Sequence, residues 1–225
     1  HGRLGTSMKT TRKTAAITLM IAAALAMAAC TPTTPTDPTT SPTASSTATS
    51  TPTPTPEAAP TQDPVPAPTT QQEAITGASN TIQQYLAASF ALAQNPDLGE
   101  SYLDGFLVQG SPQAKVIRDT VAHNIEIGLR QTGSPTTWKT NDAMSYASQS
   151  TNAATGEKFE FGAAIVYGCA DNTSWTFEVP EGQVAPEIPR GSFPNQYTLI
   201  YEQTAQVWLI QENVSLRDQD GAPTC

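Results

Sequence analysis

The chain has 225 residues and a formal net charge of −9, but its composition changes sharply along its length. Thr, Pro and Ser supply 30 of the 40 residues at positions 31–70, and all 15 aromatic residues follow residue 80, which excludes a single globule of 225 residues. Residues 30–225 carry seven basic and twenty acidic side chains, and this net charge of −13 argues against binding to nucleic acid.

The amino end is typical of an exported protein. Residues 1–7 precede the first Met and carry no pattern, so we interpret them as an expression-vector scar or upstream read-through. Three basic residues at positions 9–13 then precede an apolar run over 15–26, which is too short to be a comfortable permanent membrane span. Residues 8–29 are therefore predicted to be a lipoprotein signal peptide.

The end of this segment, Met27-Ala28-Ala29-Cys30, resembles the lipobox of bacterial lipoproteins, in which the cysteine thiol carries diacylglycerol after the signal is cut. Met27 stands where Leu is usual. Ordinary signal-peptide cleavage near Ala28 is the alternative, and it would leave a plain secreted protein with a stray Cys30. We expect Cys30 to be lipidated and the protein to be extracytoplasmic, anchored to the outer face of the cell membrane by its N-terminal lipid.

The cysteine count agrees with this reading. There are three cysteines, and an unpaired thiol is a liability in an oxidising compartment. If Cys30 is acylated, Cys169 and Cys225 remain as a pair, and we expect them to form a disulfide. The alternative is that both stay reduced.

Residues 30–71 are predicted to be a disordered tether. The Thr-Pro alternation at 51–56 fixes the backbone in polyproline-like extension and removes hydrogen-bond donors, so the segment has nothing to pack. It contains no Lys or Arg, which speaks against docking to anionic headgroups.

Helical periodicity begins after the tether. The spacing predicts a helix over 72–94 that Asn95-Pro96 ends, and a short helical piece over 102–108. Ser111 and Pro112 then indicate the start of another helix, which is expected to end near Gly133. The predicted inner stripe of that helix is Ile117, Val121, Ile125 and Leu129.

Beyond Pro135 the apolar residues recur at every second position, as in a β-strand. Strands are predicted over 138–148, 159–167, 175–179, 197–203 and 206–216, with a turn over 151–157 and a Pro/Gly-rich loop over 180–196. In the two last strands, Tyr197, Leu199 and Tyr201 are expected on one face and Trp208, Ile210, Val214 and Leu216 on another. Helices followed by consecutive short strands indicate an α+β fold with an antiparallel sheet.

The lipobox, the Thr/Pro tether, the leading helices and the antiparallel strands together resemble secreted actinobacterial lipoproteins with an NTF2-like (cystatin-like, SnoaL-like) domain. The most specific stretch runs from Gly168 to Trp175 and is followed by Arg190, the hairpin 197–210 and Cys225. The resemblance covers 72–225 and implies N-terminal helices packed on a curved sheet that forms a cone. Such a cone either encloses a ligand pocket or is filled with side chains, and NTF2-like domains often pair through the sheet.

If the cone is open, four aromatic residues could line an apolar pocket: Phe161, Tyr167, Trp175 and Tyr201. An ordinary filled core explains the same residues. Enzymes of this superfamily hold an acid–base group inside the cone, but His123 lies off the predicted inner stripe. Asp142 and Glu202 are the candidate inward acids, although strand carboxylates are more often solvated.

We therefore predict no catalytic residue, no metal site and no cofactor. No phosphate loop, nucleophile elbow or Cys/His metal spacing occurs, and Asp218 to Gly221 lacks the glutamate that would complete a calcium loop. The expected function is a membrane-anchored envelope lipoprotein whose domain is a non-catalytic binding or assembly module. Its expected partner, besides the membrane, is an envelope protein or a small apolar ligand. The alternative is an isomerase- or dehydratase-type enzyme.

Overall fold

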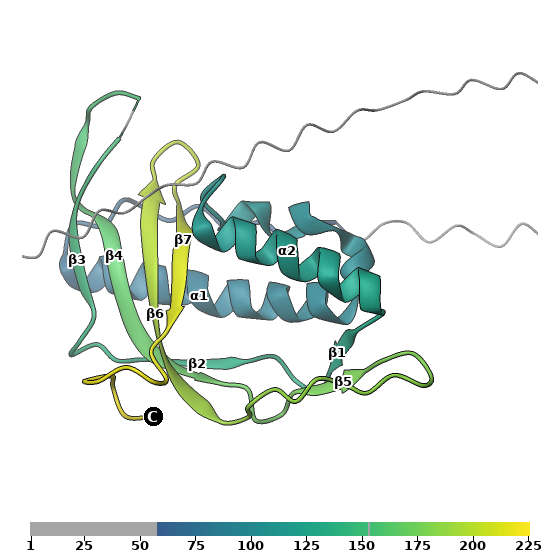
Figure 1. Ribbon diagram of the computed structural model, residues 1–225. Helices are drawn as coiled ribbons and strands as arrows, with labels where there is room; N and C mark the ends of the chain where they lie inside the picture. The colour runs from purple at the N-terminus through teal and green to yellow at the C-terminus, as the bar shows by residue number, and fades with distance from the viewer. Residues whose placement is uncertain (1–57, 153) are drawn as a thin grey trace, which may run out of the picture. The chain divides into compact units, whose positions relative to one another are not determined.

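The computed structural model describes residues 58–152 and 154–225. Helices come first and strands follow, and Figure 1 shows the strands crossing the helical layer, so the α+β class is confirmed. The predicted signal peptide, Cys30 and most of the predicted tether lie outside the described residues. Among the helices that the structure describes, none combines the length and hydropathy needed to cross a lipid bilayer.

The first helix, α1 (Gln71–Gln94), begins and ends on local signals. The Thr70 side chain accepts a hydrogen bond from the Glu73 N–H, and the Glu73 carboxylate accepts in return from the N–H and hydroxyl of Thr69. The helix stops at Asn95 because a residue before proline is driven out of helical geometry. Its start and end match the predicted helix 72–94 closely.

Two short 3₁₀ turns, η1 (Pro96–Leu98) and η2 (Glu100–Phe106), lead to α2 (Pro112–Ile127). The second helix is shorter than predicted, because Gly128 adopts a left-handed conformation with φ 65° and caps it. Val121 is buried, but Ile125 is 51% exposed, so the predicted inner stripe is wrong at that residue.

The described strands form a five-stranded antiparallel sheet and a two-stranded one. In the larger sheet β4 (Lys158–Asp171), β6 (Ser192–Glu202) and β7 (Val207–Ser215) lie in that order, and β2 (Thr137–Thr140) and β3 (Tyr146–Thr151) pair along the free edge of β4. The smaller sheet pairs β1 (Arg130–Thr132) with β5 (Thr176–Glu178).

The strand predictions need three corrections. The expected strand 138–148 is two strands, because the chain turns at residues 141–145. Residues 130–132, expected in a helix, pair with β5, and residues 192–196, expected in a loop, belong to β6. Long-range pairing partners decide these boundaries, and a local pattern does not contain them.

The face assignments also change. Ala164 and Val166 of β4 are fully buried, whereas Ile165 and Tyr167, on the opposite face, are only partly buried. In the last two strands Leu199 lies opposite Ile210, so both point to the same face, contrary to the prediction. Ala164 and Val166 belong to one core cluster with aromatic residues from α1, β6 and β7, namely Tyr85, Tyr197, Tyr201 and Trp208.

The last part of the predicted tether belongs to the folded unit. The Gln62 amide donates to the carbonyl oxygens of Gly105 and Trp208, at 2.8 Å each, and accepts from the Thr81 hydroxyl. Val65 donates its N–H to Gln206 at 2.7 Å and accepts from the Tyr201 hydroxyl at 2.7 Å. Residues 58–70 therefore form a strap across the domain, and the expected boundary at residue 72 is too late.

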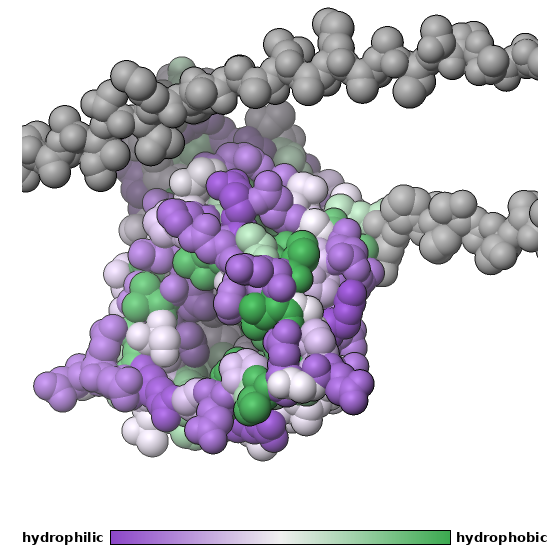
Figure 2. Space-filling model, turned by 45° about the vertical axis from the view of Figure 1, so that its right-hand side comes forward, coloured by the Kyte–Doolittle hydropathy of each residue, from purple (hydrophilic) through white to green (hydrophobic). Residues whose placement is uncertain are grey.

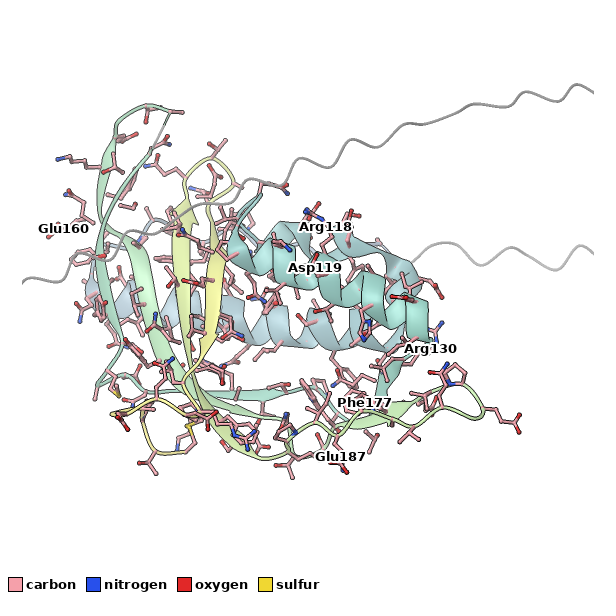
Figure 3. The ribbon with its side chains drawn as sticks, viewed as in Figure 1. Arg118, Asp119, Arg130, Glu160, Phe177 and Glu187 are labelled. Atoms are coloured by element: carbon pink, nitrogen blue, oxygen red, sulfur yellow. A yellow bond between two sulfur atoms is a disulfide. The ribbon has the colours of Figure 1, made fainter. Side chains whose placement is uncertain are left out.

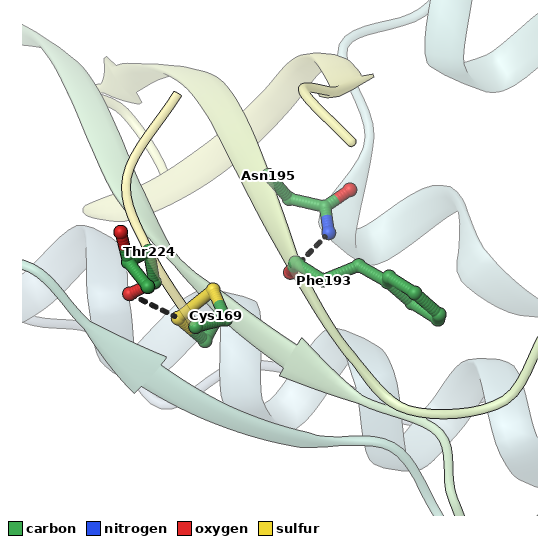
Figure 4. The surroundings of a disulfide bond; sticks show 5 residues. Cys169, Phe193, Asn195 and Thr224 are labelled. Carbon is green, nitrogen blue, oxygen red and sulfur yellow. Dashed lines mark hydrogen bonds between the residues drawn. A yellow bond between two sulfur atoms is a disulfide. The ribbon is translucent and has the colours of Figure 1, made fainter. Parts of the chain in front are cut away.

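Cys169 of β4 and Cys225 form a disulfide, with their Cα atoms 5.7 Å apart (Figure 4). The paired cysteines agree with the sequence prediction. Sγ of Cys169 lies 4.0 Å from the carbonyl oxygen of Thr224. The bridge joins the end of the chain to β4, next to the point where Cys169 faces Pro194 of β6.

Candidate functional site

A turn at the end of β4 positions Trp175. The Asp171 carboxylate accepts hydrogen bonds from the Thr173 hydroxyl at 2.6 Å and the Thr173 N–H at 2.8 Å, and these bonds lower the pKa of Asp171. The backbone N–H of Trp175 then donates to the backbone carbonyl oxygen of Asn172. The ring of Trp175 packs edge-on against Phe177 at 6.2 Å between centroids, which ties it to β5.

Asn172 holds the following loop in place. It is buried, its Nδ2 donates to the Pro189 carbonyl at 3.1 Å, and its Oδ1 accepts from the Gly191 N–H at 2.9 Å. The Asn172 N–H also donates to the Gly191 carbonyl. Three hydrogen bonds to two neighbouring loop residues fix the chain just before β6 begins.

A β-bulge determines the position of Asn213. The register between β6 and β7 shifts between Thr198 and Leu199, so that β7 carries one extra residue there. One extra residue reverses the face of every side chain that follows. Asn213 therefore lies opposite Tyr197, on the buried face where the alternation pattern had placed Val214.

These residues surround a cavity of about 220 Å³ at the end of the core. On the side that Figure 2 brings forward the surface is hollowed, and hydrophobic residues lie among hydrophilic ones around the hollow. None of the side chains that line the cavity is charged. The lining residues are Leu86, Thr136, Ala170, Asn172, Trp175, Phe193, Asn195, Tyr197, Asn213 and Ser215.

Two residues of this lining each contain a buried polar atom that lacks a hydrogen-bond partner. Across the part of the chain that the structure describes, three buried side-chain polar atoms have no hydrogen-bond partner: Ser89 Oγ, Trp175 Nε1 and Asn213 Oδ1. Two of the three belong to residues that line this one cavity. The indole N–H can only donate and the amide oxygen can only accept. Leaving such a group unpaired costs about 1–3 kcal/mol, so the pair needs an explanation.

The core behind the cavity is filled by aromatic rings. Tyr197 packs edge-on against Trp138 at 5.2 Å and Tyr85 at 6.4 Å, and Tyr85 packs against Phe106. The Tyr85 hydroxyl accepts from Gln113 Nε2 at 2.8 Å. Burial raises the pKa of both Tyr85 and Tyr197, so both phenols stay neutral and neither is a base at neutral pH.

The four predicted pocket residues do not meet in one cavity. Trp175 lines the cavity, but Tyr201 donates its hydroxyl to the strap and packs on Trp208. Tyr167 lies on the opposite face of the sheet from Tyr201, and Phe161 is partly buried against the hydrophobic core. When both faces of a strand carry apolar side chains, the alternation of side chains along the sequence does not show which face packs against the core.

The candidate acid–base residues lie elsewhere. Asp142 is exposed in the turn between β2 and β3, and His123 is exposed on α2. The Glu202 carboxylate accepts from the backbone N–H groups of Ala205 at 2.6 Å and Thr204 at 3.1 Å, and these bonds lower its pKa. A carboxylate with a lowered pKa is a weak base, so Glu202 serves as a turn acceptor in the β6–β7 hairpin.

Two ion pairs join residues of the helical region and β1 on the outside of the fold. Figure 3 shows Arg118 and Asp119 on α2, Arg130 at the start of β1, and Glu187 on the loop that follows β5. Arg130 bonds Asp97 at 3.0 Å and Arg118 bonds Glu100 at 2.8 Å. Among the described residues, no group of three or more His, Cys, Asp or Glu side chains could hold a metal ion.

Sequence reasoning missed Asn172, Tyr197 and Asn213 as site residues. The run Asp171-Asn-Thr-Ser174, within the stretch that carries the family resemblance, is typical of a turn and is the local signal that indicates Asn172. No local sequence pattern indicates Asn213 as a site residue, because the β-bulge that turns its side chain inward depends on pairing with β6.

Comparisons with known proteins assign no family. No family model matches this chain, and no curated protein matches it. Among solved structures, the intermembrane space region of chloroplast protein ARC6 aligns with 64% of this chain and 97% of its own length. The identity is 15% and the TM-score 0.35, so this likeness carries no argument about the present protein.

Proposed function

We propose that this protein is a lipid-anchored lipoprotein of the cell envelope whose α+β domain is a non-catalytic binding module, with the cavity between Trp175 and Asn213 as its ligand site. The observation that carries the binding role is a cavity with an uncharged lining that combines aromatic rings with polar side chains.

The membrane anchor and the fold family are part of the same proposal. The basic residues, the apolar run and Met27-Ala-Ala-Cys30 support export and lipidation at Cys30. Leading helices packed on a twisted antiparallel sheet support an NTF2-like domain. The hydrogen bonds of Gln62 and Val65 support a folded unit that includes the last residues of the expected tether, and the residues before it are proposed to be the tether itself.

Binding is favoured over acid–base catalysis by the chemistry of the lining. Among the described residues that line the cavity there is no carboxylate and no imidazole, and the Tyr197 phenol is held neutral by burial. Proton transfer at neutral pH needs a titratable group tuned toward neutrality. The side chains present are suited to hydrogen bonding and to packing against a ligand.

Replacing Asn213 by leucine tests the site without knowledge of the ligand. If the amide is kept for a ligand, Asn213→Leu removes an unsatisfied acceptor and leaves the free energy of unfolding unchanged or raises it by about 1 kcal/mol. Urea unfolding of the full chain measures this, with Asn80→Leu on the exposed face of α1 as the matched control. A loss of more than about 1 kcal/mol relative to that control would mean that the amide has a structural role, and would overturn the proposed site.

The anchor has its own test. Cys30→Ser is expected to move the protein from the membrane fraction to the soluble secreted fraction, because the thiol that accepts lipid is gone. Mass spectrometry of the parent should find the acyl chains on Cys30. An unmodified Cys30, or a variant that stays membrane-bound, contradicts the lipoprotein assignment.

A further inference from the structure

We infer that residues 58–68 of the strap form a latch, which opens by itself while the rest of the domain stays folded, and which a pull on the preceding chain releases. Residues 1–57 precede the strap, so any load on them enters the described fold through it. The inference rests on the proposed function for one thing, since the membrane tether is the source of that load.

The latch adds nothing to the hydrophobic core. None of residues 58–68 is fully buried. None of them belongs to the core cluster or to the partly buried apolar residues that pack against it. Burial of apolar surface is the main source of stability in a folded domain. A segment without it opens at a lower free energy than the core does.

Polar contacts of two residues hold the latch instead. In the described part of the chain, five hydrogen bonds join residues 58–68 to the rest of the fold, three through the Gln62 amide and two through the backbone of Val65. No ion pair or disulfide between described residues includes this segment. Water replaces such hydrogen bonds when the segment detaches, so each of them contributes only modestly to holding it closed.

The latch has a defined hinge. Thr69 and Thr70 exchange hydrogen bonds with Glu73 and cap the first turn of α1, so they stay with the helix when the latch opens. Opening therefore breaks the hydrogen bonds of Gln62 and Val65 and leaves the cap of α1 intact.

Opening changes the surface beside β7. The strap forms one wall of a groove of about 660 Å³, and residues of α1 together with Trp208 line the rest. Release of the latch also removes the partners of the Thr81 and Tyr201 hydroxyl groups and of the Trp208 carbonyl oxygen. The closed and open forms therefore present different surfaces, and the pull on the chain selects between them.

Hydrogen exchange in the purified full chain tests whether the latch opens alone. The Val65 N–H, which bonds Gln206, reports on the latch, and the Leu199 N–H, in the middle of the sheet, reports on the core. We expect Val65 to exchange about a hundredfold faster than Leu199 or more, at a rate that low concentrations of urea leave unchanged. Equal rates with the same urea dependence would show that the strap opens only with the whole domain, and would overturn the inference.

Optical tweezers test the effect of load, with handles attached at the two ends of the purified chain. We expect two unfolding steps. The first is small and releases at most about 40 Å of chain, which is the reach of the eleven residues 58–68. The second is several times larger, because the domain itself then unfolds. A single large step would overturn the inference.

Two variants assign the small step to the latch. Gln62→Ala removes three of the five hydrogen bonds, so it should lower the force of the small step and speed the exchange of Val65 about tenfold or more. The force of the large step should stay the same, because the latch is already open when the domain unfolds. Asp63→Ala, at an exposed neighbouring position, is the control and should change neither step. A small step that Gln62→Ala leaves unchanged would arise elsewhere in the chain and would overturn the inference.

These measurements distinguish failure of the latch from failure of the proposed function. They use the purified chain without a membrane, so their outcome does not depend on lipid at Cys30. A single unfolding step would overturn the latch and leave the anchor and the cavity untouched. Membrane retention of Cys30→Ser would contradict the anchor, and it would change neither the exchange of Val65 nor the unfolding steps.

Discussion

The backbone of Gly77 in α1 lies directly against the indole of Trp208 in β7. A Cβ built on Gly77 would be 2.7 Å from Nε1 and 3.2 Å from Cδ1 of Trp208, closer than real side chains approach. Trp208 is 1% exposed and its ring packs on Tyr201, so it has little freedom to move away. Glycine is therefore required at position 77 for this close contact, although it is a poor helix former.

Gly77→Ala is expected to destabilise the domain by about 1–3 kcal/mol, even though alanine is the better helix former by about 1 kcal/mol. The reason is that the indole or the helix must shift to make room. Urea unfolding gives the free energy, and Thr76→Ala, at an exposed neighbouring position, is the control that should be neutral or stabilising. Stability equal to the parent in Gly77→Ala would show that the contact is loose.

Gln62→Ala is expected to lower the free energy of unfolding by about 1–3 kcal/mol, because one amide serves three partners. Thr81 is 4% exposed and its hydroxyl would lose its acceptor, and the carbonyl oxygens of Gly105 and Trp208 would lose a donor. Gln83→Ala, on the exposed side of α1, is the matched control. If the two variants unfold alike, the strap does not contribute to the stability of the fold.

Removal of the disulfide is expected to cost about 2–4 kcal/mol, because the bridge closes a loop between residues 56 positions apart and restricts the unfolded chain. Cys225→Ser, the Cys169→Ser/Cys225→Ser double variant and the reduced parent should all show the same loss in thermal and urea unfolding. A larger loss in the double variant than in Cys225→Ser would mean that Cys169 has a further packing role.

The capping interaction of Glu73 predicts a pH dependence of stability. Hydrogen bonds from Thr69 lower the pKa of this carboxyl below its ordinary value of 4.5, so the folded state binds its proton less tightly than the unfolded state. The stabilisation is then fully present above pH 4.5 and is lost as the pH falls through the lower pKa of the folded state.

Glu73→Gln should therefore be less stable than the parent at neutral pH, and the difference should shrink as the medium is acidified below pH 4.5. Unfolding by urea at a series of pH values measures the difference. Glu126→Gln, an exposed carboxyl on α2, is the control. A difference that does not change with pH would assign the effect of Glu73 to helix propensity.

Short-range signals in the sequence were enough for the starts of the two long helices, for the end of α1 and for the class of the fold. Thr70 and Glu73 begin α1, Pro96 follows its end, and Ser111 with Pro112 begins α2. Each signal acts through neighbouring backbone groups, so it needs no knowledge of the rest of the molecule. The change of period after Pro135 likewise predicted an antiparallel sheet that follows the helices.

Tertiary contacts alone decided the strap, the pairing of β1 with β5 and the candidate site. Residues 58–70 have the composition of a tether, and only the partners of Gln62 and Val65 fix them. The bulge in β7 turns Asn213 inward because the register with β6 shifts there, and no local pattern carries that register. The cavity therefore arises from residues far apart in sequence, since side-chain direction in a strand depends on pairing as well as on alternation.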